Sequence, residues 1–363
     1  MKITLVTETY PPDVNGVAMT LEQIARGLAE RGHQVTIVRP DPGVATQPSH
    51  ERIHLHHVRG MPIPCYPELK FGFPAGRHLK KRWVEDRPDL VHVATEGPLG
   101  RTAMKAARRM DIPRTSSFHT NFHTYAGFYG WGWLQKMTLG FLRKVHTQAG
   151  RTFVPSETVR KALQPAGFEN LQVLGRGVDT ARFSPAKRDE ALRASWGADP
   201  DTPVAFYVGR LATEKNIELT VRAFEAMRAA RPGTRCVLVG DGPMRAKLER
   251  EHPHYHFAGM RLGEDLARHI ASADVFPFAS MTETFGNVVT EGMASGLVVL
   301  AYDYAAARLH VDSGRNGIAV PFGDEEAYLA AATTLMEDEA SWSAMREAAV
   351  ATAEGLSWSA IVD

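Results

Sequence analysis

Small and basic residues follow an apolar run in the second half of the sequence. Gly209, Arg210 and Lys215 come just after residues 204–208, whose composition is typical of a buried strand. Ligands of open α/β sheets bind at the carboxyl ends of strands, and two cations at such an end suit a diphosphate. The segment therefore predicts a diphosphate site, although a strand-to-helix loop that only carries surface charges fits this feature equally well.

A second group of residues follows the apolar run at 275–278. Its members are Glu283, Thr284, Phe285, Gly286, Asn287 and Glu291. A helix that begins near Phe285 would direct its free N–H groups toward an anion. Carboxylates accept hydrogen bonds from paired hydroxyls, so Glu283 and Glu291 could hold a sugar and a ribose. The alternatives are a carboxylate that matches the helix dipole at Glu283 and a solvated helix face at Glu291.

Two weaker signals lie in the first half. Asn15 and Gly16 follow a strand-like run at 3–6, where a small residue opening a helix lets a ligand approach the backbone. The segment lacks the G-x-G-x-x-G fingerprint, so a dinucleotide site is not indicated. His119 ends another strand-like run at 115–119, but a lone histidine is more often structural than functional.

Metal and thiol motifs are weak. Asp199 and Asp201 have D-x-D spacing around a proline, a composition that forms turns, so the sequence favours a turn there. Histidines cluster at 54–57 and at 252–256, but the sequence shows no cysteine or glutamate that completes a tetrahedral zinc set with them. The two cysteines, Cys65 and Cys236, have no C-x-x-C context. No metal site is predicted.

Strand-like runs alternate with amphipathic helical stretches along the whole chain, a pattern that indicates parallel sheets. We predict an α/β protein of two doubly wound, Rossmann-like domains that face a cleft. The predicted domains are residues 1–168, to which 357–363 could return, and residues 169–356. A single barrel is the alternative, but the irregular stretch at 175–203 and the charge distribution weigh against it.

Composition supports two domains and excludes several classes. The chain has 363 residues, 44% hydrophobic and 23% charged, as in folded globular proteins. The net charge of +1 combines +9 over residues 1–170 (23 basic, 14 acidic) with −8 over the remainder (19 basic, 27 acidic). The sequence has no apolar run of membrane-spanning length and no signal-peptide pattern at its start, so a cytoplasmic location is expected.

The basic first half predicts an anionic partner, which composition alone leaves open among membrane lipid, a phosphorylated acceptor and nucleic acid. Residues 123–133 hold five aromatics and three glycines, which fits an acceptor or membrane-facing loop and local packing equally. Basic residues at 77–82 and 101–109 favour a peripheral contact with anionic membrane at its inner face, and nucleic acid is not our prediction.

In combination these motifs resemble the retaining glycosyltransferases of the GT-B fold, in the glycogen-synthase-like family with a Glu-x(7)-Glu motif. Glu283 and Glu291 have that spacing. The matching segments are residues 9–17, 175–185, 209–216 and 240–243, so the resemblance covers nearly the whole chain. Many members of the family have Gly-Gly where this chain has Asn15-Gly16.

The resemblance implies a nucleotide-sugar substrate held mainly by the second domain, with no cofactor and no metal. Arg210 and Lys215 would neutralise the diphosphate, Glu291 would bind the ribose and Glu283 the donor sugar. His119 would face that sugar. The remaining donor-binding residues that it implies are Asn15, Gly16, Gly209, Asp241, Thr284, Phe285, Gly286 and Asn287.

Residues 118–123 and the aromatic stretch after them look like the bacterial α-mannosyltransferase and glycolipid-synthase branch. That branch implies a GDP-mannose donor and a lipid or glycolipid acceptor. The motifs do not separate guanine from uracil, so a UDP-sugar-dependent glycolipid transferase is the alternative. A non-catalytic sugar-nucleotide-binding protein and a sugar-nucleotide epimerase rank below both.

Overall fold

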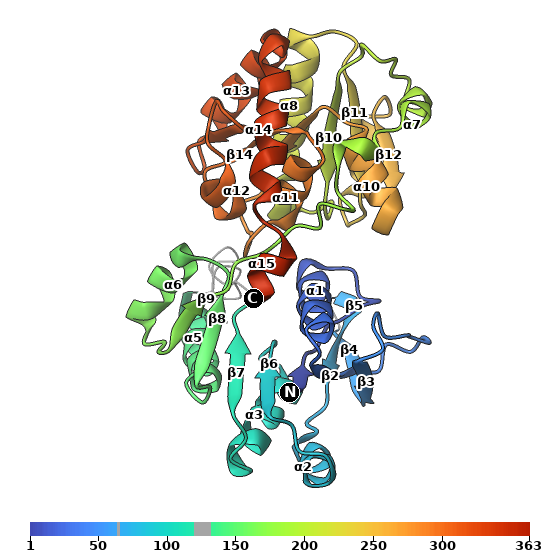
Figure 1. The fold of residues 1–363 in the computed structure, drawn as a ribbon. Helices are drawn as coiled ribbons and strands as arrows, with labels where there is room; N and C mark the ends of the chain where they lie inside the picture. The colour runs from blue at the N-terminus through green and yellow to red at the C-terminus, as the bar shows by residue number, and fades with distance from the viewer. Residues whose placement is uncertain (64–65, 120–131) are drawn as a thin grey trace. The chain divides into compact units, whose positions relative to one another are not determined.

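The computed structural model describes residues 1–63, 66–119 and 132–363 and divides into two compact units (Figure 1). The first unit contains residues 1–176 together with 358–363, and the second contains residues 177–357. The first unit thus extends beyond residue 168, where the sequence analysis places the boundary.

The first unit is built on a parallel seven-stranded sheet with the order β3-β2-β1-β6-β7-β8-β9. Its strands are β1 (Lys2–Val6), β2 (Gln34–Pro40), β3 (Ile53–Val58), β6 (Leu90–Val93), β7 (Arg114–Ser117), β8 (Arg151–Val154) and β9 (Leu171–Val173). Its helices are α1 (Gly16–Glu30), α2 (Gly76–Glu85), α3 (Pro98–Arg109), α5 (Gly132–His146), α6 (Glu157–Leu163) and α15 (Trp358–Val362). The sequence analysis does not predict the antiparallel hairpin of β4 (Gly60–Ile63) and β5 (Tyr66–Gly72).

Both faces of the first sheet are buried, because successive side chains of a strand point to opposite faces. In β1, Leu5 packs in one core with Ile37 of β2, whereas Val6 packs in another core with Val93 of β6. The short helix α15 packs on α1, and a Cβ added at Gly27 would lie 3.0 Å from a methyl carbon of Val362.

The second unit is built on a parallel six-stranded sheet with the order β12-β11-β10-β13-β14-β15. The strands are β10 (Val204–Val208), β11 (Arg235–Val239), β12 (His256–Gly259), β13 (Val275–Phe278), β14 (Val298–Tyr302) and β15 (Ile318–Val320). The helices are α7 (Glu190–Ser195), α8 (Ile217–Ala230), α9 (Arg245–Glu251), α10 (Gly263–Ala271), α11 (Asn287–Ala294), α12 (Ala305–His310), α13 (Glu325–Glu337) and α14 (Trp342–Glu354).

Each sheet starts in an inner strand, adds two strands on one side and then crosses to the other side. The order therefore reverses between β1 and β6 in the first unit and between β10 and β13 in the second. Two separate open parallel sheets confirm the predicted doubly wound α/β architecture and exclude the single barrel.

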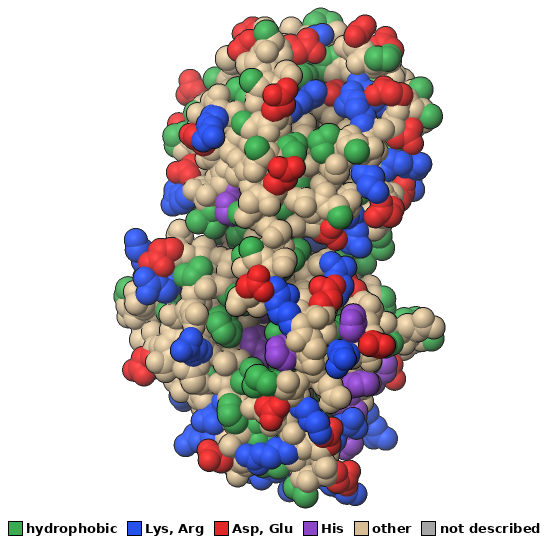
Figure 2. All heavy atoms as spheres, in the orientation of Figure 1, with side chains coloured by type: hydrophobic (Ala, Val, Ile, Leu, Met, Phe, Trp, Pro, Cys, Tyr) green, Lys and Arg blue, Asp and Glu red, His purple; other side chains and the backbone are tan. Residues whose placement is uncertain are grey.

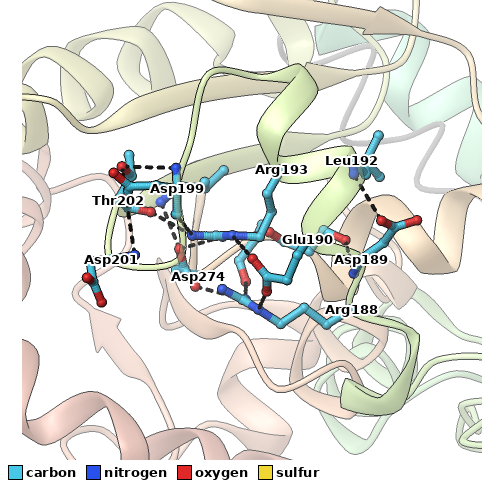
Figure 3. A network of polar contacts seen from close by, with 12 residues as sticks. Arg188, Asp189, Glu190, Leu192, Arg193, Asp199, Asp201, Thr202 and Asp274 are labelled. Atoms are coloured by element: carbon cyan, nitrogen blue, oxygen red, sulfur yellow. Dashed lines mark hydrogen bonds and ion pairs between the residues drawn. The ribbon is translucent and has the colours of Figure 1, made fainter.

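A buried carboxylate, Asp274, anchors the segment that leads into the second sheet (Figure 3). Its oxygens accept hydrogen bonds from Arg188 at 3.1 Å, from Arg193 at 3.0 Å and from Arg346 at 2.8 Å. The carboxylate of Asp274 also accepts a hydrogen bond at 2.8 Å from the backbone N–H of Val204, the first residue of β10. Burial alone would raise the pKa of Asp274, but the three guanidinium groups hold it below its usual value.

Replacing Asp274 with alanine should lower the free energy of unfolding by about 3–5 kcal/mol, because guanidinium groups would lose their buried partner. Urea unfolding at pH 7 measures this loss. Since the lowered pKa makes the stabilisation present at neutral pH and lost only in strong acid, the difference from the parent should shrink as pH falls below the aspartate range.

The matched control is Asp303→Ala, which breaks an exposed ion pair with Arg308 whose atoms lie 3.1 Å apart. That change should cost no more than about 1 kcal/mol. Equal losses in the two variants would contradict the anchoring role of Asp274.

Candidate functional site

The two segments singled out in the second half of the sequence follow neighbouring strands. Gly209 comes directly after β10 and Glu283 comes shortly after β13, and these two strands pair in parallel at the point where the strand order reverses. Ligands of doubly wound folds bind outside the carboxyl ends of strands at such a reversal. The topology therefore brings the two predicted groups to one place.

Glycines allow the loops after β10 and β11 to touch. A Cβ at Gly240, where φ is 131°, would lie 2.0 Å from the carbonyl oxygen of Gly209. Hydrogen bonds from Gly209 to Val239 (3.0 Å) and from Leu211 to Asp241 (2.9 Å) join the backbones of these loops. The carboxylate of Asp241 accepts from the N–H of Gly242 at 2.7 Å, so it closes its own loop.

Lys215 and Glu283 form an ion pair with 2.6 Å between Nζ and Oε1. Both side chains are mostly buried, with exposed fractions of 20% and 15%. The Ser280 hydroxyl donates to the same Glu283 oxygen at 2.7 Å, and the Tyr304 hydroxyl donates to the Glu283 carbonyl at 2.8 Å. Hydrogen bonds therefore hold Glu283 at both its side chain and its backbone. Its ionic partner, Lys215, is one of the two cations that the sequence analysis predicts for the diphosphate.

Arg210 is more accessible than Lys215. Its Nη1 lies 3.6 Å from Glu214 Oε1, and 39% of its side chain is exposed. Its backbone carbonyl accepts from the buried hydroxyl of Tyr207 at 3.1 Å. Burial raises the pKa of that tyrosine, and Glu283 and Glu214 raise it further, so it stays a neutral donor. The backbone at Arg210 is fixed while its guanidinium can meet a ligand.

Helix α11 begins at Asn287, two residues after the predicted start, because Gly286 has a left-handed φ of 87°. Phe285 is buried, and its backbone carbonyl accepts from Ala306 at 2.7 Å. Burial raises the pKa of Glu291 to about 7, with Arg182 opposing the rise. Glu291 is therefore not on a simply solvated face. Thr284 and Asn287 are partly buried in the same segment.

In the first unit, Asn15 caps α1. Its Oδ1 accepts from the N–H groups of Val17 at 3.1 Å and Ala18 at 2.9 Å, and its Nδ2 donates to Thr9 at 2.8 Å. Gly16 is the first helical residue. The asparagine that departs from the common Gly-Gly pair thus has a defined task, which is to satisfy donors at the helix start.

The loop before Asn15 is held by a residue to which the sequence analysis gave no role. Arg39 of β2 is 1% exposed, and it donates to the carbonyls of Tyr10 and Pro11 and, at 2.9 Å, to Asp13. Asp13 in turn accepts from Thr9 at 2.9 Å. No local signal marks Arg39, since an arginine in a strand is ordinarily exposed.

His119 lies just after β7 and is 3% exposed. Its Nδ1 lies 2.7 Å from Nη2 of Arg176, which is 6% exposed. Burial lowers the pKa of His119 well below its usual value, and Arg176 lowers it further. Arg176 lies in the segment 175–185, which resembles the family, but the sequence analysis gave this residue no role.

The aromatic stretch at 123–133 lies outside the described residues except at its last two positions, whose side chains are not described.

The chain matches two family descriptions, "Glycosyltransferase Family 4" over residues 14–182 and "Glycosyl transferases group 1" over residues 202–338. It is 33% identical to a GDP-mannose-dependent alpha-mannosyltransferase of Mycobacterium tuberculosis, across 100% of this chain and 94% of the relative. The chain belongs to the group 1 glycosyltransferases.

This glycosyltransferase is also similar to a glycolipid synthase and to a solved structure. An alpha-monoglucosyldiacylglycerol synthase of Streptococcus pneumoniae is 27% identical over 83% of this chain and 71% of the relative. The crystal structure of Anabaena HepE in complex with UDP and glucose superposes with a TM-score of 0.77 at 19% identity, covering 100% of this chain and 97% of that one. This likeness confirms the GT-B fold of the glycosyltransferase.

The D-x-D segment of the glycosyltransferase forms a turn (Figure 3). Asp199 Oδ1 accepts from the hydroxyl of Thr202 at 2.6 Å and from the N–H of Asp201 at 3.1 Å. The carboxylate of Asp199 thus serves local structure, as the turn interpretation predicts.

The second histidine cluster has a partner that sequence spacing could not reveal. Glu225 of α8 lies beside His252 and His254, and the ligand atoms of the three lie within 4.8 Å of one another. They are the one such group of metal-ligating side chains within the described part of the glycosyltransferase. However, the Arg228 guanidinium already contacts Glu225, at 3.2 Å, and His254. The guanidinium of Arg228 therefore already places a positive charge beside these side chains.

Proposed function

We propose that this glycosyltransferase transfers a hexose, mannose from GDP-mannose, to a lipid or lipid-linked acceptor with retention of configuration and without a metal. The observation that carries the proposal is the Lys215–Glu283 pair at the strand-order reversal of the second sheet. One member of the pair suits a diphosphate and the other suits sugar hydroxyls.

In the proposed reaction, the bond between the anomeric carbon and the diphosphate oxygen breaks. A bond from that carbon to the acceptor hydroxyl forms on the same face, and the hydroxyl proton passes to the departing phosphate. Arg210, Lys215 and the N–H groups at the start of α11 would stabilise the negative charge that develops on the leaving group. Fixed cations can supply this stabilisation, which supports a reaction without a divalent ion.

The site residues specify the nucleobase of the sugar-nucleotide donor less than any other part of the proposal. A relative that is 33% identical is named as GDP-mannose-dependent, which favours guanine and mannose. The second candidate is a UDP-sugar, because the Anabaena structure of the same fold contains UDP and glucose. The same two cations would serve either diphosphate.

Nucleotide binding distinguishes the two donors. We expect GDP and GDP-mannose to stabilise the protein in a thermal-shift panel that includes UDP, ADP and their sugar conjugates, with EDTA or Mg²⁺ added in parallel. A ligand at 100 times its dissociation constant adds about 2.7 kcal/mol. Selective stabilisation by UDP would replace the GDP assignment, and a requirement for Mg²⁺ would contradict metal independence.

Site variants test catalysis. Lys215→Ala, Glu283→Ala and His119→Ala should each lower the transfer rate by at least about 100-fold in a folded protein, because each removes a group that meets the donor. Transfer of radiolabelled mannose to a lipid extract measures the rate. Near-normal turnover in both the Lys215 and Glu283 variants would contradict the site assignment.

The matched controls are Lys187→Ala and Glu264→Ala, which break an exposed ion pair of 2.8 Å in the same unit. They should leave transfer unchanged. Nucleotide binding without transfer in the parent would favour a non-catalytic binding protein. Conversion of the nucleotide sugar to its epimer without acceptor would favour an epimerase.

The first unit also carries a basic surface that supports contact with anionic lipid headgroups. Its members are exposed or half-exposed residues of α2 and α3, namely Arg77, Lys80, Lys81, Arg82, Arg101, Lys105 and Arg108. Apolar side chains lie near it: Phe141 of α5 packs under the Arg101 guanidinium at 5.5 Å, and Phe71 and Phe73 are exposed. Figure 2 shows Lys and Arg side chains along the α2 and α3 end of the first unit on its visible face. None of the described helices could cross a membrane.

Charge reversal tests this surface. Lys81→Glu combined with Lys105→Glu should weaken binding to phosphatidylglycerol vesicles by at least about tenfold, because each basic residue near an anionic surface contributes about 1 kcal/mol. Binding of the parent should fall with added salt. Arg315→Glu, at an exposed position of the second unit, is the control. Failure of the parent to bind these vesicles at any salt concentration would contradict the proposal.

A further inference from the structure

The contact between Arg176 and His119 joins two buried side chains of the first unit. Nη2 of Arg176 lies 2.7 Å from Nδ1 of His119. The guanidinium has no carboxylate partner among the described residues, and this is its one side-chain hydrogen bond there. Burial lowers the pKa of Arg176 to about 10, so it still carries its charge at neutral pH.

This contact determines the protonation state of the imidazole. A guanidinium can only donate, so Nδ1 of His119 must accept and cannot carry a proton. A neutral imidazole with a bare Nδ1 carries its proton on Nε2. A charged imidazolium would present an N–H to Arg176 and would meet a like charge, so the same contact opposes protonation.

His119 differs from its neighbours in having one ring nitrogen to spare. Nε2 of His119 is buried and has no hydrogen-bond partner among the described residues. By contrast, both ring nitrogens of His92 bond to Thr115 and Ser117, and those of His146 bond to Ser116 and Glu96. A buried N–H without an acceptor costs free energy, which an acceptor oxygen from a ligand would recover.

We propose that Arg176 is a positioning residue that holds His119 as a neutral Nε2–H donor, and that this N–H binds an oxygen of the donor sugar. The inference rests on the proposed function, because it takes the donor sugar as the ligand of His119. In this state His119 cannot act as a general base through Nε2, since that nitrogen already bears a proton. Its task is to orient the sugar.

Few titratable or charged groups of the described residues face His119. They are Arg176, His92 of β6 and His146 of α5, and Glu96 lies behind His146 at 3.0 Å. Burial lowers the pKa of His92 to about 4, so that ring is neutral too. Arg176 is therefore the permanent cation beside His119, and its removal should let the pKa of His119 rise.

Nuclear magnetic resonance reads the tautomer without relying on activity. Long-range ¹H–¹⁵N spectra of histidine-labelled protein should show His119, assigned by its loss in His119→Gln, with the proton on Nε2. In Arg176→Met that signal should shift toward a mixture of tautomers. Because Arg176→Met could fail to fold, Arg176→Lys is the second variant, and its ammonium donor should preserve the Nε2–H form. Arg160→Met, at a half-buried arginine whose guanidinium donates to Glu157 at 2.7 Å, is the matched control.

Kinetics then separates positioning from stability. For Arg176→Met we expect kcat to fall roughly tenfold or more with partial recovery in Arg176→Lys, as for other partners that orient a functional histidine. We also expect the acid-side loss of kcat to begin at a higher pH in Arg176→Met than in the parent, because one of the causes that lower the pKa of His119 is removed while burial remains.

Two results would overturn the role of Arg176. One is a parent His119 that carries its proton on Nδ1 or is charged at pH 7. The other is folded Arg176→Met in which both the Nε2–H tautomer and the pH profile of kcat are the same as in the parent. If the tautomer responds as expected while His119→Ala transfers sugar normally, the tautomer assignment stands and the assignment of the donor sugar as ligand is overturned.

Discussion

The parallel pairing of β10 with β11 on one side and β13 on the other determines where every candidate group of the second unit lies. Parallel strands place their carboxyl ends at one sheet edge, and connections on opposite sides of β10 leave that edge open. The Gly209 loop and the segment at Glu283 meet there because of this pairing, although they are far apart in sequence. The loop that contains Gly240 can approach the Gly209 loop closely because a glycine has no Cβ to collide with the Gly209 carbonyl.

The cations of the candidate sites have different partners in the two units. In the second unit the cations already have carboxylate partners, Lys215 with Glu283 and Arg210 with Glu214. An anionic ligand there would exchange one partner for another, so the free site avoids the cost of isolated charge. In the first unit Arg176 contacts a neutral ring and leaves one N–H unsatisfied. The Nε2–H of His119 therefore lacks a hydrogen-bond acceptor among the described residues, and a ligand that supplies one would be favoured over a ligand that does not.

Most of the fold could be predicted from runs of apolar residues in the sequence. Most of the candidate site residues could be predicted because they directly follow such a run. The runs at 204–208 and 275–278 are continuous apolar segments, and they are indeed strands. The β4–β5 hairpin escaped prediction because its sequence has prolines and no clear alternation. Arg39, Arg176 and Glu225 escaped because their partners lie 26, 57 and 29 residues away. Such contacts depend on the completed fold, and residue type alone gives no sign of them.

The return of residues 358–363 to the first unit makes the second unit an uninterrupted stretch of chain and the first a discontinuous one. During synthesis, residues 177–357 emerge before α15 does, so the second unit can complete its sheet while the first still lacks a helix. Arg31 of the first unit donates a hydrogen bond at 2.9 Å to the carbonyl of Ser359, so this bond can form only after residue 359 has been synthesised. All seven strands of the first sheet precede β10, so that sheet can form first, but α1 gains its contact with α15 only after the second unit has been synthesised.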